Sequence, residues 1–149
     1  MKEIWKDIKD FEGYYQISNL GRIRSVTRKA KVKILNNDYR TIKGQLLSPA
    51  KTKDGYLKVS LSKEHKRYYF KVHRLVAQTF IPNPNNYPCV NHKDENKLNN
   101  CIENLEWCTI KYNCNYGSRN SKIYNKTSFR KGHIPWNKGK TWFKRNTKK

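Results

Sequence analysis

The most regular alternation of apolar and polar residues lies in YLKVSLS, at positions 56–62. Every second residue from Leu57 onward is apolar and the residues between are polar, as in a strand with one buried face. A polar turn at 63–66 and a further strand-like segment, RYYFKVH at 67–73, complete the pattern of a β-hairpin.

Two shorter alternating segments lie nearer the N-terminus, YYQIS at 14–18 and RIRSV at 22–26, joined by the turn sequence Asn-Leu-Gly. They predict a small two-stranded unit. Its apolar side chains are expected to form a core rather than to stack on bases: Tyr15, Ile17 and Ile23. Residues 29–37 are only loosely patterned and are expected to form a loop.

Helical spacing replaces alternation at 73–80, where Val76 and Phe80 lie four residues apart and share a face. Pro82 and Pro84 would end this helix. A turn-rich connection follows it.

The next part of the chain predicts a second, smaller set of elements. Short strands at 90–92 and 105–108 flank a polar loop. Thr109 is suited to cap the N-terminus of a helix over 110–116, and Gly117 is suited to end that helix.

The charge balance indicates the kind of partner. The 149 residues include 33 Lys and Arg against 11 Asp and Glu, a formal net charge of +22. Such an excess predicts a polyanion, and nucleic acid is favoured because clustered cations release counterions from phosphates. An anionic membrane surface is the alternative, but the sequence shows no basic amphipathic helix with a broad apolar face.

Charge also marks a boundary near residue 118. Acidic residues end at Glu106, whereas residues 119–149 carry eleven Lys and Arg. Aromatic residues alternate with cations and glycines in this last segment. We interpret it as an extended arm that orders on a duplex, with a solvated, disordered tail as the alternative.

Targeting and cysteine usage both point to a reducing compartment. No apolar signal-peptide core is present at the N-terminus, and no run of about 18 apolar residues occurs, so an intracellular protein is expected. Four cysteines lie without a C-x-x-C spacing: Cys89, Cys101, Cys108 and Cys114. Reduced thiols are favoured over a four-thiolate zinc site, which remains the alternative.

Residues 90–109, VNHKDENKLNNCIENLEWCT, combine one histidine with a nearby carboxylate and several asparagines. A neutral histidine can accept a proton near pH 7, and oxygen ligands hold a hard cation. This combination suits hydrolysis of a phosphodiester in a polyanion. The predicted strand–loop–strand–helix order would bring Asn91, His92 and Asn113 around one point.

This segment, with VHRLVAQTFIPNP before it, resembles HNH endonucleases of the phage and intron-encoded, or homing, type over roughly 56–117. Two further segments resemble modules that accompany such nucleases. Trp5–Val26 is similar to an N-terminal nuclease-associated module, and KGHIPWNKGKT at 131–141 is similar to a short C-terminal DNA-binding module.

The resemblance implies an α+β fold. Small antiparallel β-hairpins precede a ββα-metal (HNH, or His-Me finger) nuclease core, and an extended basic C-terminal arm follows. The corresponding domains are 1–55, 56–118 and 119–149. The resemblance also implies cleavage of double-stranded DNA with one divalent cation, Mg²⁺ or Mn²⁺, in the cytoplasm of a bacterial host.

Position by position, the resemblance makes His92 the general base and places Asn91 and Asn113 where the metal ligands lie. Asn104 falls on the middle asparagine, which braces the loop and orients the histidine. Many family members have Asp where this chain has Asn91, so weak metal binding with recovery in Mn²⁺ is expected. Asp94 is the nearest carboxylate and a candidate ligand, directly or through water, with an Asx-type cap of the loop as the alternative.

The candidate DNA contacts are basic side chains from three regions: Arg22, Arg24, Arg74, Lys131, Lys138 and Lys140. His73 is expected to be structural or to contact a phosphate rather than to act in catalysis. No long apolar stripe suggests a dimer interface, so a monomer is expected, with a dimer as the alternative. The competing functions are a non-catalytic DNA-binding protein that lost its metal through Asn91 and an RNA-binding protein.

Overall fold

The computed structural model describes residues 2–31 and 39–118. Contacts divide the chain into two compact units, Met1–Asn115 and Tyr116–Lys149. The predicted basic arm at 119–149 lies outside the described residues. It contains three of the lysines predicted to contact DNA: Lys131, Lys138 and Lys140. No helix in the described ranges is long and apolar enough to cross a membrane.

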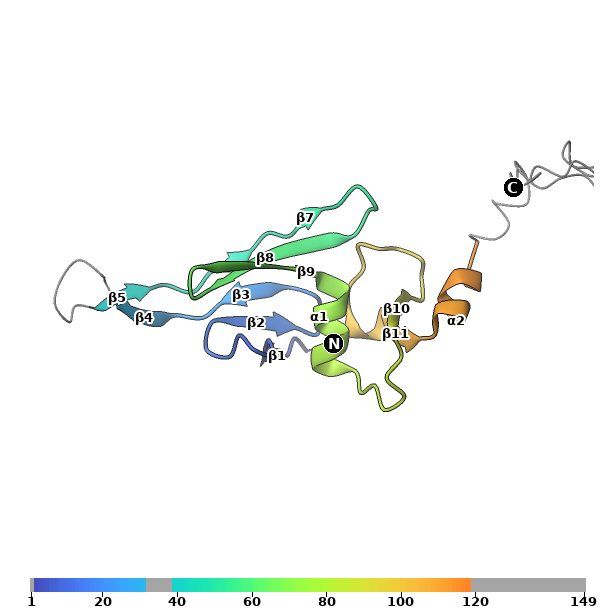
Figure 1. The fold of residues 1–149 in the computed structure, drawn as a ribbon, viewed down its shortest axis with the longest axis horizontal. Helices are drawn as coiled ribbons and strands as arrows, with labels where there is room; N and C mark the ends of the chain where they lie inside the picture. Colours follow the sequence, from blue (N-terminus) through green and yellow to red (C-terminus); the bar gives the residue numbers. More distant parts are fainter. Residues whose placement is uncertain (1, 32–38, 119–149) are drawn as a thin grey trace, which may run out of the picture. The chain divides into compact units, whose positions relative to one another are not determined.

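The N-terminal part is a four-stranded antiparallel sheet with the order β1 (Trp5–Asp7), β2 (Tyr15–Ser18), β3 (Ile23–Ser25) and β6 (Leu46–Leu47) (Figure 1). The sequence predicted only the β2–β3 pair, so the expected two-stranded unit was incomplete. The outer strands are three and two residues long. Alternation is not visible in such short segments, and only pairing defines them.

A separate ribbon pairs β4 (Arg28–Lys31) with β5 (Tyr39–Ile42). The expectation of a loop over 29–37 was therefore wrong for its first residues. The β4 sequence RKAK has no apolar alternation, and its cross-strand partner rather than a buried face makes it a strand.

The predicted β-hairpin is confirmed as β8 (Leu57–Lys63) and β9 (Lys66–Lys71), and β7 (Ala50–Lys51) pairs with the outer edge of β8. The turn between β8 and β9 consists of Glu64 and His65, which both have positive φ, 51° and 63°. A two-residue turn with this backbone matches the right-handed twist of the strands it joins.

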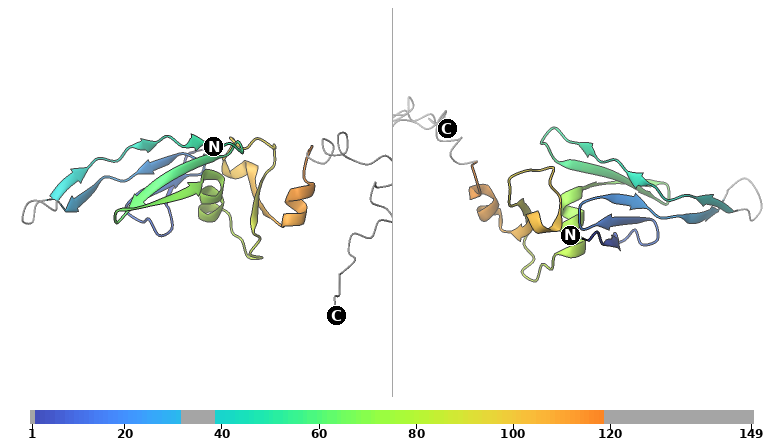
Figure 2. Two further views of the ribbon diagram at one scale, coloured as in Figure 1. Left: turned by 45° about the horizontal axis from the view of Figure 1, so that its top comes forward. Right: turned by 180° about the vertical axis from the view of Figure 1, so that it is seen from behind.

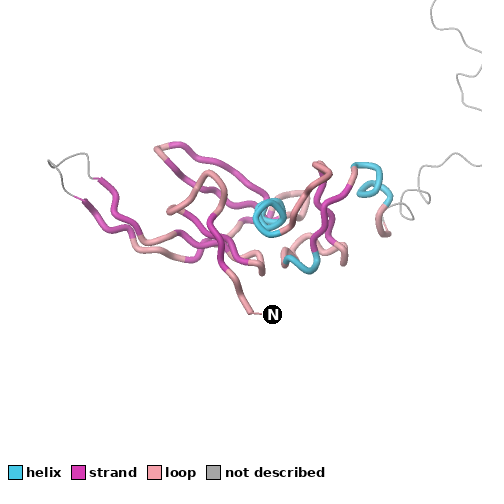
Figure 3. Tube along the Cα trace, turned by 90° about the horizontal axis from the view of Figure 1, so that it is seen from below, coloured by secondary structure: helices cyan, strands magenta, loops and turns pink. Residues whose placement is uncertain are grey.

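Helix α1 (Val72–Phe80) follows β9 directly and begins one residue earlier than predicted. It lies between the N-terminal strands and the next hairpin (Figure 2), and Figure 3 shows it end-on in that position. Its apolar face is buried, as the helical spacing predicted.

The second hairpin consists of β10 (Cys89–His92) and β11 (Leu105–Cys108), with a 3₁₀ turn, η1 (Ile102–Asn104), just before β11. Helix α2 (Ile110–Asn115) comes next. The hydroxyl of Thr109 accepts a backbone N–H from the first turn of α2 at 3.2 Å, which confirms the predicted N-cap.

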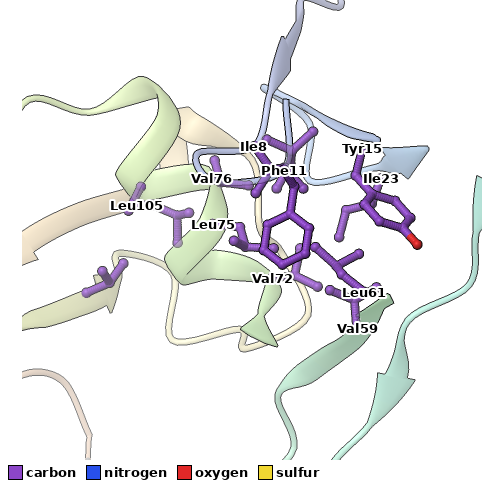
Figure 4. Packing of buried hydrophobic residues seen from close by; sticks show 13 residues of the cluster. Ile8, Phe11, Tyr15, Ile23, Val59, Leu61, Val72, Leu75, Val76 and Leu105 are labelled. Carbon is purple, nitrogen blue, oxygen red and sulfur yellow. The ribbon is translucent and has the colours of Figure 1, made fainter. Parts of the chain in front are cut away.

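One hydrophobic core joins the N-terminal sheet, α1 and both hairpins (Figure 4). Its members come from both halves of the described chain: Ile8, Phe11, Tyr15, Ile17, Ile23, Val59, Leu61, Val72, Leu75, Val76, Ala77, Val90 and Leu105. The Tyr15 hydroxyl also donates to the Ser62 carbonyl and accepts the Ser62 N–H, both at 3.1 Å. The segments predicted as domains 1–55 and 56–118 thus share a core.

Candidate active site

His92 is the last residue of β10, and its side chain is only 5% exposed. Its Nε2 atom lies 3.2 Å from Asn100 Oδ1, and Asn100 Nδ2 donates to the Leu98 carbonyl at 3.1 Å. The bond to Leu98 fixes the Asn100 amide so that its oxygen faces the imidazole, and that oxygen can only accept. The network therefore assigns the proton of neutral His92 to Nε2 and leaves Nδ1 as the acceptor.

The Nδ1 atom of His92 is the ring nitrogen left to accept a proton. It has no hydrogen bond within the described ranges, where His73 Nδ1 is the one buried side-chain atom without a partner. Burial lowers the pKa of His92, and the Asn100 hydrogen bond and the Asp94 charge oppose that shift. The imidazole is consequently neutral at pH 7 and able to accept a proton there.

His73, on α1, packs against His92. The two ring centroids are 5.0 Å apart, and the Tyr56 ring lies 4.9 Å from His73 and 6.0 Å from His92. His73 is 5% exposed, and this burial is the main reason that its pKa falls to about 3; the charges of His92, Lys71 and Arg74 also lower it. The structure thus favours the structural role among those considered for His73, with a contact to His92 that the sequence did not reveal.

Asn91 precedes His92 on β10 and pairs with Glu106 on β11. The two residues are directly opposite in the register, and Asn91 Nδ2 donates to Glu106 Oε1 at 2.8 Å. Sequence reasoning missed Glu106 and took Asp94 as the nearest carboxylate. The register of the two predicted strands could have revealed the pair, because His92 and Leu105 flank the loop as partners.

Asp94 is engaged inside the loop between β10 and β11. Its Oδ1 accepts the Asn96 N–H and Asn104 Nδ2, each at 2.8 Å, and its Oδ2 accepts Asn99 Nδ2 at 2.7 Å. These bonds, that from Asn99 foremost, lower the pKa of Asp94. The arrangement is that of the Asx-type cap considered as the alternative to a metal ligand.

Asn104 braces the same loop. Its Oδ1 accepts the Asp94 N–H at 3.0 Å, and its Nδ2 donates to Asp94 Oδ1 and to the Asn99 carbonyl, each at 2.8 Å. The Asn104 side chain therefore acts on His92 indirectly, by holding the loop, whereas Asn100 is hydrogen-bonded to the imidazole itself.

A turn of the N-terminal sheet also contacts the loop between β10 and β11. The Ile102 N–H donates to the Asn19 carbonyl at 2.8 Å. Gly21, with φ +80°, lies so close to Asn100 that an added Cβ would be 2.9 Å from Asn100 Cβ. The N-terminal sheet thus touches the residue that holds His92.

Asn91, the neighbour of His92 on β10, carries an amide oxygen of the kind that binds a hard cation. Asn91 Oδ1 accepts no hydrogen bond from any residue that the structure describes. Asn113 is half-buried on α2, which packs against β10. Within 2–31 and 39–118, no three His, Cys, Asp or Glu side chains are arranged to hold a metal. This donor set fits a single Mg²⁺ or Mn²⁺ held largely by amide oxygens and water.

The four cysteines are free thiols. Cys89 and Cys108 are opposite each other on β10 and β11, and burial raises the pKa of Cys108 to about 11. A thiol with such a pKa stays protonated at neutral pH and is a poor metal ligand.

Two of the predicted DNA contacts have protein partners in the N-terminal sheet. Arg22 forms an ion pair with Glu3. Arg24 donates to Gln16 Oε1 at 2.9 and 2.7 Å, and its guanidinium lies 4.3 Å from the Trp5 ring. Both arginines are therefore oriented in advance, and Arg22 would have to exchange Glu3 for a phosphate.

Further cations lie beside the two histidines. Arg74 donates to the Pro88 carbonyl. The ammonium groups of Lys71 and Lys97 lie 4.3 and 4.8 Å from the centre of the Tyr56 ring, which itself contacts His73 and His92. The sequence did not single out these two lysines, because their place next to the site depends on the fold.

Comparison with known proteins identifies the class. Residues 70–114 match the family model of HNH endonucleases, and residues 3–62 match that of the NUMOD4 motif. The N-terminal match extends well beyond Trp5–Val26, the segment whose resemblance was visible in the sequence. The chain thus carries an HNH endonuclease region preceded by a NUMOD4 motif.

Within that class it is related to the DNA endonuclease I-HmuI of Bacillus phage SP01, with 41% identity over 109 residues that cover 73% of this chain and 54% of that protein. An HNH endonuclease of Acanthamoeba polyphaga mimivirus, L245, is 53% identical over 79 residues, covering 52% of this chain and 24% of its own length. The fold is similar to the solved structure of the HNH homing endonuclease I-HmuI, with a TM-score of 0.60 and 36% identity over 85% of this chain and 62% of that one. This chain thus spans between a quarter and about half of the length of these curated relatives.

Proposed function

We propose that this protein is a metal-dependent endonuclease of the homing type that hydrolyses phosphodiester bonds in double-stranded DNA. The observation that carries the proposal is the state of His92, which is neutral, bonded through Nε2 to Asn100 and without a hydrogen bond at Nδ1 from the described residues. A histidine in this state is suited to act as a general base. I-HmuI binds and cleaves DNA, and the likeness to it supports the same substrate here.

In this proposal His92 Nδ1 takes a proton from water as the water oxygen attacks phosphorus. Asn100 Oδ1 accepts the Nε2 hydrogen throughout, so it keeps the ring in place and stabilises the imidazolium that forms. Asn104 and Asp94 hold the loop on which Asn100 lies. His73, neutral at pH 7, packs against His92 without adding a positive charge to it.

Asn91 and Asn113 are the residues proposed to hold the divalent cation, Mg²⁺ or Mn²⁺. When bound, this cation neutralises charge on the scissile phosphate and on the departing 3′ oxygen. An amide oxygen is neutral and binds a hard cation less tightly than a carboxylate does, so we expect low affinity for Mg²⁺.

The DNA contacts proposed here extend outward from the two histidines. Lys71 and Lys97 lie against the Tyr56 ring that contacts both histidines, and they would meet phosphates near the cleaved bond. Arg22, Arg24 and Arg74 would add contacts along the folded unit. Lys131, Lys138 and Lys140 would lengthen the interface in the basic arm, and the net charge of +22 supports a long contact with the duplex.

The test is cleavage of supercoiled and linear DNA with a candidate target, in Mg²⁺, Mn²⁺ or EDTA. His92→Ala should lower the single-turnover rate by about 10²- to 10⁴-fold, because a general base contributes that much. His65→Ala is the matched control, since His65 is exposed in the β8–β9 turn. Cleavage that persists in His92→Ala would remove His92 as the base, and equal activity in EDTA would remove the metal.

A non-catalytic DNA-binding function is the second candidate, and Asn91 is the observation that favours it. Tight binding without cleavage in every metal would support that function. Asn91→Asp is then the variant to examine, because it places a carboxylate before His92.

A further inference from the structure

We propose that Glu106 belongs to the metal site, where its carboxylate supplies the negative charge that Asn91 lacks and fixes the orientation of the Asn91 amide. The proposal rests on the nuclease function proposed above. It adds a residue from β11 to a site that the sequence assigned to β10, the loop and α2.

The hydrogen bond between the two side chains decides which atom Asn91 offers. Asn91 Nδ2 donates to Glu106 Oε1 at 2.8 Å. A carboxylate accepts and does not donate, so the reversed amide would set two oxygens against each other. Glu106 therefore holds Asn91 with its Oδ1, a hard-cation ligand, turned away from the carboxylate.

The same pair of side chains also determines the charge available to a cation. A divalent cation gains most from anionic oxygens, and the amide of Asn91 carries no charge. Both oxygens of Asp94 are occupied by loop hydrogen bonds. Glu106 is half-buried. Partial burial weakens solvent screening, so the attraction between this carboxylate and a cation on Asn91 is stronger than at the surface.

The alternative role for Glu106 is to hold the β10–β11 hairpin together without any effect on metal binding. Glu106→Gln separates the two roles. Glutamine keeps the shape and an oxygen that accepts from Asn91 Nδ2, and it removes only the charge. Glu103→Gln is the matched control, because Glu103 is an exposed carboxylate on η1 and its replacement changes the net charge equally.

The experiment measures Mn²⁺ binding to the full chain without DNA, by electron paramagnetic resonance of free Mn²⁺, together with the thermal unfolding temperature of each variant. Glu106→Gln should weaken Mn²⁺ binding by roughly 10- to 100-fold while the unfolding temperature stays near that of the native protein. Glu103→Gln should bind as the native protein does. The double variant Asn91→Asp with Glu106→Gln returns one carboxylate to the pair and should bind Mn²⁺ at least as tightly as the native protein.

Native affinity in Glu106→Gln would overturn the proposal while leaving the nuclease function intact. Equal weakening in Glu103→Gln would also overturn it, since the effect would then follow net charge rather than position. A native protein that binds no Mn²⁺ would overturn both this proposal and the proposed metal site. Cleavage assays in metal and EDTA then decide separately whether the nuclease function stands.

Discussion

Replacing Gly21 with alanine should displace Asn100 and thereby slow catalysis from a distance. Gly21 lies in the turn between β2 and β3, with φ +80°. An alanine Cβ there would be 2.9 Å from Asn100 Cβ and 3.0 Å from the Asn100 carbonyl oxygen. Part of this contact is with backbone, which cannot rotate away, so either the turn or Asn100 must move.

The stability that Gly21→Ala loses has two parts. A left-handed φ destabilises a residue other than glycine by about 1–2 kcal/mol. Forcing a methyl group into a filled space adds about 1–3 kcal/mol. Gly13 separates the two parts, because its φ is +73° and an added Cβ would meet no atom within 4 Å. Gly13→Ala should therefore show only the first part, and the difference between the variants measures the contact with Asn100.

The assays are urea unfolding and single-turnover cleavage at saturating DNA and Mn²⁺. Asn100 sets the protonated nitrogen of His92, and a shift of about 1 Å at such a residue can lower the rate by about 10²-fold. We expect Gly21→Ala to lose more stability than Gly13→Ala and to cleave far more slowly at temperatures where both are folded. Equal stabilities and native cleavage rates in both variants would refute the claim that this turn positions Asn100.

Two further predictions concern pH. Because burial lowers the pKa of His92, the ratio kcat/KM should rise with pH and then level off. The inflection should lie below about 6.5, the ordinary pKa of histidine. An inflection above that pH would contradict a buried, neutral base. His73 has a pKa of about 3 in the folded state and about 6.5 in the unfolded state. As pH falls below about 6.5, His73 binds a proton in the unfolded chain but not in the folded one, so the folded protein loses stability. From pH 7 to 5, the free energy of unfolding in urea should fall by about 2 kcal/mol more in the native protein than in His73→Leu. If the free energies of the two proteins changed with pH in parallel, His73 would have the same pKa in the folded and unfolded states.

Patterns within a few residues determined much of the fold. Alternation predicted β8 and β9, helical spacing predicted α1, and Thr109 marked the start of α2. These elements follow from contacts between near neighbours in sequence and from one buried face, so the sequence displays them directly. The strands without such a face, β1, β4, β5, β6 and β7, went unrecognised, because only their partners make them strands.

The residues of the candidate site divide in the same way. His92, Asn91 and the loop-bracing Asn104 lie within one short segment whose composition indicates phosphodiester chemistry, and its resemblance to HNH endonucleases is visible in the sequence alone.

Only the tertiary structure decided which groups surround these residues. It placed Asn100 on His92 Nε2, Glu106 on the Asn91 amide, and His73 against the His92 ring. It also brought the N-terminal turn at Gly21 onto Asn100. Strand register, loop closure and the shared core decide these contacts. Each of those features sums many weak interactions over the whole folded unit, which no local pattern of residues can encode by itself.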